Sequence, residues 1–83
     1  MLYTAKCYWP GVSADELERV VARVHSSSYR GSLLYPDDAL VLCLFDAGTS
    51  HAVQRESERV GLPCERLMPT LWLGATSIER SLG

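Results

Sequence analysis

Five side chains of this 83-residue chain could bind a transition metal: three thiols and two imidazoles. They are Cys7, Cys43, Cys64, His25 and His51, and no two of them form a Cys-x-x-Cys or His-x-x-His pair. Without such spacing, a closed site within one chain has little support. A soft ion could bridge Cys7 and Cys43, or symmetry could assemble Cys43, His25 and His51 across a dimer. Because free cysteine is among the most buried residue types, we favour packing roles for Cys7 and Cys43, and structural or solvated roles for the histidines.

A second group of side chains suggests a site for an organic ligand. Lys6 and Tyr8 alternate onto one face of a predicted strand, and Tyr35 and Trp72 could join them from other strands. An aromatic-walled pocket with one or two polar groups is the usual form of a small-molecule site. A lysine there could act as an acid or base if desolvation lowered its pKa. The alternative, which we favour, is an interface surface whose lysine extends to water.

Composition excludes several classes of protein. The net charge is −2, with 8 basic and 10 acidic residues scattered along the chain, so nucleic-acid binding is disfavoured. No apolar run approaches the roughly 18 residues that a membrane helix needs. The first residues lack the basic and apolar regions of a signal peptide. An odd number of cysteines does not make a disulfide framework, so we expect a reduced, cytoplasmic protein without membrane or nucleic-acid partners.

The hydrophobic period changes along the chain in an order that predicts the fold. Period-2 or continuous apolar stretches predict strands, and a period of 3.6 predicts helices. The order is strand, helix, two strands, helix, strand, over residues 2–9, 13–26, 29–35, 39–46, 50–60 and 65–73. This βαββαβ pattern is that of ferredoxin-like domains. We therefore expect one α+β domain over residues 1–73, with a four-stranded antiparallel sheet in the order 4-1-3-2, two helices on one face, and a polar tail over residues 74–83.

Local signals support these boundaries. Ser13 followed by Glu16 is a capping box at the start of the first helix, and Thr49 or Ser50 should cap the second. Gly61 stands where a left-handed residue ends a helix. Pro69 suits an edge strand, because it has no N–H for a neighbouring strand.

The predicted third strand favours a dimer. Residues 39–45 are apolar on both faces, which is typical of a strand that is covered on both sides. Two helices can cover only one face of the sheet, so a second copy of the chain is the simplest cover for the other. We expect Tyr3, Ala5 and Cys7 to face the helices, because that leaves charged Lys6 on the other side.

Several stretches resemble one family of small bacterial proteins. They are YWPGV (8–12), PDD (36–38), CLFDA (43–47) and ERVGLP (58–63). Over residues 2–73 the chain is similar to the ferredoxin-like proteins known as nickel-binding, a domain family otherwise of unknown function. The resemblance implies a dimeric ferredoxin-like domain, with metal binding in at least one member of the family and nickel as the metal that its description suggests. Nickel prefers imidazole, nitrogen and oxygen donors, and the chain offers only His25 and His51 as imidazoles.

These observations lead to three hypotheses of function. The first is a small homodimeric binding protein that binds nickel or another ligand at the sheet face or the dimer interface. The second is a cofactor-free enzyme of the dimeric α+β barrel kind, acting on a small organic substrate through Lys6, Tyr8 or Tyr35. The third is an assembly module without a ligand.

Overall fold

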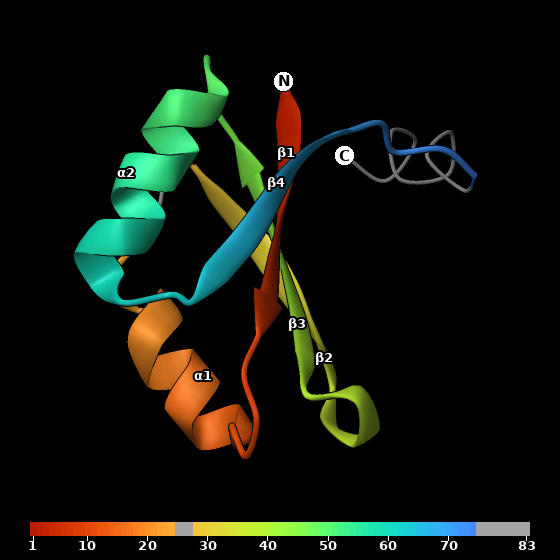
Figure 1. Ribbon diagram of the computed structural model, residues 1–83. Helices are drawn as coiled ribbons and strands as arrows, with labels where there is room; N and C mark the ends of the chain where they lie inside the picture. Colours follow the sequence, from red (N-terminus) through yellow and green to blue (C-terminus); the bar gives the residue numbers. More distant parts are fainter. Residues whose placement is uncertain (25–27, 75–83) are drawn as a thin grey trace.

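The computed structural model describes residues 1–24 and 28–74, and it confirms the predicted fold (Figure 1). The sheet order β2-β3-β1-β4 is the predicted order, with each strand antiparallel to its neighbours. The chain is thus a ferredoxin-like α+β protein. In chain order the elements are β1 (Leu2–Tyr8), α1 (Ala14–Val21), β2 (Tyr29–Tyr35), the 3₁₀ turn η1 (Pro36–Asp38), β3 (Leu40–Asp46), α2 (Ser50–Val60) and β4 (Cys64–Thr70).

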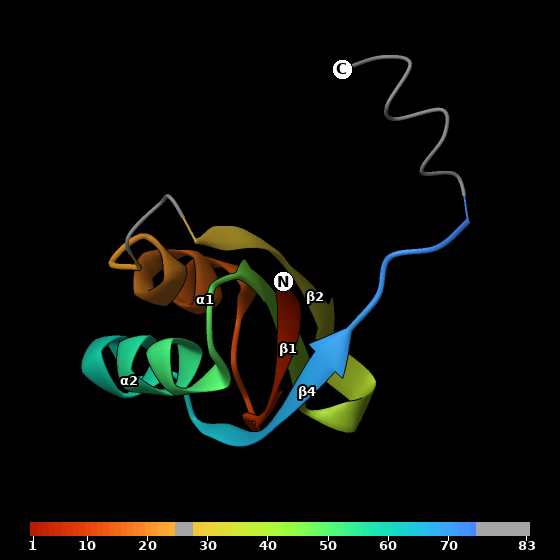
Figure 2. The same ribbon diagram turned by 90° about the horizontal axis from the view of Figure 1, so that it is seen from above.

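The core lies between the sheet and the two helices, which cover the same face (Figure 2). As expected, Tyr3, Ala5 and Cys7 of β1 point towards the helices and are buried. The remaining buried apolar side chains include Val41, Cys43 and Phe45 of β3, Leu17 and Val20 of α1, and Val53 and Val60 of α2. The rings of Phe45 and Tyr29 pack edge to face with centroids 5.8 Å apart.

Helix α1 begins as predicted but ends early. The Ser13 hydroxyl accepts a hydrogen bond from the Glu16 N–H at 3.1 Å, so Ser13 is the N-cap. The predicted end at residue 26 was wrong, because the α-helix stops at Val21. After it the chain tightens, since the Val24 N–H bonds the carbonyl three residues back rather than four. Residues 25–27, which include His25, lie outside the described residues.

Helix α2 has the predicted bounds and caps. Thr49 is its N-cap, with the hydroxyl accepting from the Ala52 N–H at 3.1 Å. Gly61 ends it with a φ of 87°, in the left-handed region. The N–H groups of Gly61 and Leu62 both bond the Ser57 carbonyl, and Leu62 folds back into the core. Both bonds go to one of the carbonyl acceptors that a helix end otherwise leaves free.

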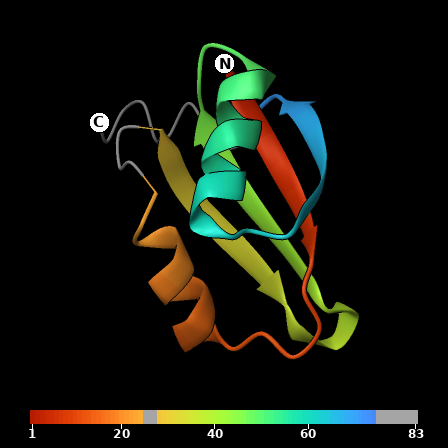
Figure 3. The same ribbon diagram turned by 60° about the vertical axis from the view of Figure 1, so that its left-hand side comes forward.

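Strands β3 and β4 differ from the predictions at their ends. β3 begins at Leu40 because Ala39 has a φ of 53°, which is incompatible with a strand. β4 ends at Thr70, not at residue 73, because Thr70 lies opposite Leu2 and β1 offers no partner beyond it. Pro69 lies on this edge strand, as predicted (Figure 3). Within the described residues, no helix is long and apolar enough to cross a membrane.

Candidate ligand-binding surfaces

The sheet face opposite the helices, which we call the open face, carries apolar side chains that no described element covers (Figures 1 and 2). One row crosses three strands: Leu40 lies opposite both Tyr8 and Tyr35. In the next row, Leu42 lies opposite Leu33. Tyr8 and Leu33 are more than half exposed, at 57% and 52%. Large apolar patches of this kind on a small protein mark interaction sites. The open face is defined here by Lys6, Tyr8, Leu33, Tyr35, Leu40 and Leu42.

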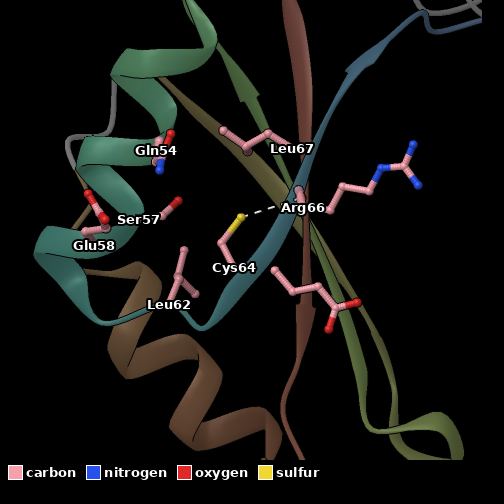
Figure 4. Close-up of a pocket in the computed structure, with 8 residues that line it drawn as sticks. Gln54, Ser57, Glu58, Leu62, Cys64, Arg66 and Leu67 are labelled. Atoms are coloured by element: carbon pink, nitrogen blue, oxygen red, sulfur yellow. Dashed lines mark hydrogen bonds between the residues drawn. The ribbon is translucent and has the colours of Figure 1, made fainter.

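Two cations lie next to this apolar surface. Lys6 lies opposite Leu42 on one side and Arg66 on the other. The Lys6 ammonium is 3.8 Å from the carboxylate of Glu65, which occupies a bulge in β4. Arg66 forms no ion pair with the described residues, and its side chain points away from the helices (Figure 4). Lys6, Arg66 and Glu65 together therefore carry a net charge of +1.

The structure brings three of the four predicted ligand-binding residues to one region. Lys6, Tyr8 and Tyr35 share the open face near the carboxyl end of β1. Trp72 follows β4, beyond the pair formed by Leu2 and Thr70. Because a strand rises about 3.3 Å per residue, Trp72 is at least ~20 Å from Tyr8 along the sheet. It cannot line the same site within one chain.

The three thiols form a second cluster, on the helix-facing side of the sheet. Cys43 and Cys7 lie on the neighbouring strands β3 and β1, and Cys64 lies opposite Cys7 on β4. β4 begins at Cys64, one residue before the predicted start at residue 65, with Glu65 in a β-bulge between Cys64 and Arg66. On the neighbouring strand β2, the Ser32 hydroxyl donates a hydrogen bond to the Cys43 sulfur at 3.1 Å.

The thiols differ in how readily they ionise. The hydrogen bond to Cys43, and then burial, hold the pKa of Cys7 far above its ordinary value. Bonds from Cys7 and Ser32 favour the thiolate of Cys43 and lower its pKa, while burial opposes them. Burial raises the pKa of Cys64. Cys43 is thus the first of the buried pair to lose a proton, but it has no exposed surface.

Two of the three predicted metal ligands, Cys43 and His51, lie in different environments. Cys43 is buried beneath the helices, whereas His51 is exposed in the first turn of α2. His25 lies outside the described residues. Within residues 1–24 and 28–74, no group of three or more histidine, cysteine or acidic side chains is arranged to hold a metal ion.

Sequence reasoning missed a pocket between α2 and β4. Its walls include Gln54 and Ser57 of α2, Leu62 of the following turn, and Cys64 and Leu67 of β4 (Figure 4). A signal was present in the sequence: Ser57 lies in the apolar stripe of α2, four residues after Val53 and three before Val60. A polar side chain at a core-facing position needs a partner or a function.

Comparison with known proteins supports the fold but gives no information on function. No family model and no curated protein matches this chain. The crystal structure of SCO4226 from Streptomyces coelicolor A3(2) is similar, with a TM-score of 0.76, over 89% of this chain and 100% of that one. The sequences are 17% identical. Folds host many unrelated functions, so this similarity identifies the architecture alone.

Proposed function

We propose that this chain is a small homodimeric binding protein whose open face forms both the subunit interface and the wall of a ligand site. The observation that carries this proposal is the row of Tyr8, Leu40 and Tyr35 beside Lys6 on a sheet face without cover from the described chain. Burial of such a face would release ordered water from several large side chains. Three free cysteines suit a reducing compartment, so we place the protein in the cytoplasm.

A second copy of this chain is the partner that best complements the face. Residues 71–74 leave β4 on the side of the sheet away from the helices (Figures 1 and 2). They expose Leu71 and Leu73 by 80% and 78%, together with Trp72. Each chain therefore carries an apolar surface and an apolar segment. In a twofold dimer, the segment of each chain can cover part of the open face of the other, because such interfaces are self-complementary.

The ligand that best fits the open face is a small organic anion with an apolar body. Lys6 and Arg66 lie side by side, and a carboxylate could accept hydrogen bonds from both. The rings of Tyr8 and Tyr35 flank Leu40 and would contact the apolar body. Nickel has less support, since Cys43 and His51 are separated. The enzyme hypothesis uses the same residues, and turnover of a bound ligand would distinguish it from simple binding.

The dimer is tested by light scattering after size-exclusion chromatography. We expect the wild type to have twice the mass of one chain at about 100 μM. Leu42→Glu should give a monomer, because it would bury a charge in the apolar interface. Ala14→Glu adds the same charge at an exposed position of α1 and should leave the dimer intact. A monomeric wild type would overturn the proposed assembly.

The ligand site is tested by NMR titration of the labelled protein with sodium benzoate. We expect shifts of the amide signals of Lys6, Tyr8 and Leu40. Lys6→Met should weaken binding roughly threefold to tenfold, because an exposed charge contributes modestly. Arg55→Met removes an exposed cation from α2 and serves as the control. Equal affinity in Lys6→Met and the wild type would contradict this site.

A further inference from the structure

The α2–β4 pocket has the size of a site for a small ligand. Its volume is about 260 Å³, just below the roughly 300 to 1,000 Å³ typical of drug-sized ligands. It opens between the helix and the edge strand, on the helix-facing side of the sheet (Figure 4). It is therefore separate from the open face, and its occupancy would not depend on the proposed dimer.

The hydroxyl of Ser57 is the observation that points to a ligand. Ser57 is fully buried, and its Oγ has no hydrogen-bond partner among the described residues. In Figure 4 the side chain points from α2 into the space in front of Cys64. A buried hydroxyl without a partner lowers stability, so its presence in a pocket wall suggests that something else supplies the bond.

The rest of the pocket wall determines what kind of molecule fits. Leu62 and Leu67 are apolar, and the Cys64 thiol already donates to the Arg66 carbonyl at 3.5 Å. The raised pKa of Cys64 keeps this thiol protonated at neutral pH. Arg66 points away from the pocket in Figure 4, and Glu65 pairs with Lys6. The exposed Glu58 also lines the pocket and would repel an anion. An anionic ligand would therefore lose hydration here without gaining an opposite charge.

We propose that this pocket binds a small neutral molecule with a compact apolar body and one hydroxyl or carbonyl oxygen. The oxygen shares a hydrogen bond with Ser57 Oγ, and the apolar body contacts Leu62, Leu67 and the Cys64 sulfur. The exposed Gln54 residue, one turn before Ser57 on the same helix, also lines the pocket. Binding is non-covalent, because a protonated thiol is a poor nucleophile.

The test is an NMR titration of the full chain with cyclohexanol. We expect the amide signals of Ser57, Leu62, Cys64 and Leu67 to shift, with an affinity in roughly the millimolar range for so small a ligand. Cyclohexanecarboxylate matches its shape but carries a negative charge, and it should bind at least about tenfold more weakly because of its desolvation.

Two variants locate the site and its hydrogen bond. Ser57→Ala should weaken cyclohexanol binding about fivefold, the effect of one neutral hydrogen bond. Because it removes a hydroxyl without a partner, this variant should melt no lower than the wild type. Ser50→Ala, an exposed serine of the same helix, is the control and should bind normally. Cys64→Met fills the pocket and should abolish the shifts.

Two results would overturn the proposal. If cyclohexanol at tens of millimolar leaves these four amides unchanged, the pocket holds water alone. If Ser57→Ala or Cys64→Met binds as tightly as the wild type, the ligand binds elsewhere.

Discussion

Cys64 lies directly opposite Cys7 across β4 and β1, on the helix-facing side of the sheet. Cys43 lies opposite Ala5 on β1, two residues before Cys7, so it is a diagonal neighbour of Cys7 on the same face. Cys7 and Cys43 have no exposed surface, whereas Cys64 is partly exposed and lines the α2–β4 pocket. The three thiols therefore share a face of the sheet but differ in access to solvent.

This difference predicts the order of alkylation. With iodoacetamide, the native protein should be modified first at Cys64, and at Cys7 and Cys43 only after unfolding. Burial raises the pKa of Cys64 above the ordinary 9.0, so its thiolate fraction should still be increasing, by about tenfold per pH unit, as the pH approaches 9. Mass spectrometry of peptides at a series of pH values measures the rate at each site.

The control for this experiment is Cys64→Ser, which should show almost no modification while folded. Modification of Cys43 before Cys64 in the native wild type would contradict the arrangement of the thiols.

Replacement by valine should lower the free energy of unfolding more at Thr70 than at Thr4. Thr70 Oγ1 donates to the Met68 carbonyl at 2.9 Å, so the buried Thr4 hydroxyl donates to Thr70 at 2.6 Å. Thr70→Val leaves the Thr4 hydroxyl without a partner and should cost about 1–3 kcal/mol in free energy of unfolding. Thr4→Val leaves Thr70 bonded to Met68 and should cost less than about 1 kcal/mol.

Urea unfolding of both variants at one protein concentration measures this difference. The two substitutions are each other's control, since both replace a hydroxyl by a methyl group in a strand. Equal losses of free energy of unfolding in the two variants would show that the Thr4 hydroxyl finds another acceptor when Thr70 is replaced.

The end of α2 should depend on backbone conformation alone. Gly61 has a φ of 87°, and a Cβ added there meets no atom within 4 Å. Gly61→Ala should therefore lose about 1 kcal/mol, the cost of a left-handed conformation for an L-residue. This corresponds to a melting temperature lower by about 4–8 °C in a domain of this size.

Gly48→Ala is the matched control, because Gly48 has equal space but no left-handed φ. Its melting temperature should be unchanged or slightly higher, since alanine restricts the unfolded chain. A similar fall in melting temperature for Gly61→Ala and Gly48→Ala would mean that the left-handed φ of Gly61 is not the cause.

Much of the fold could be predicted because its signals are local. Ser13, Thr49 and Gly61 act on the nearest turn of helix, so their roles follow from neighbouring residues. The ends of α1 and β4 were less predictable. β4 stops at Thr70 because β1 begins at Leu2, and the partner strand is remote in sequence.

The candidate sites were only partly predictable, for the same reason. Alternation places Lys6 and Tyr8 on one face, and the pairing of β2 with β3 adds Tyr35. Trp72 has the right residue type, but the antiparallel direction of β4 takes it to the far end of the sheet. The hydroxyl of Ser57 needs a structure to show whether any other group reaches it.

The sequence by itself determined the order of the elements, the helix caps and the two apolar faces of β3, because periodicity and capping depend on residues a few positions apart. Only the tertiary structure decided the register of β4, the position of Cys64 opposite Cys7 and the pocket beside Ser57. These features arise from contacts between residues far apart in the chain, where one β-bulge at Glu65 changes which side chains meet.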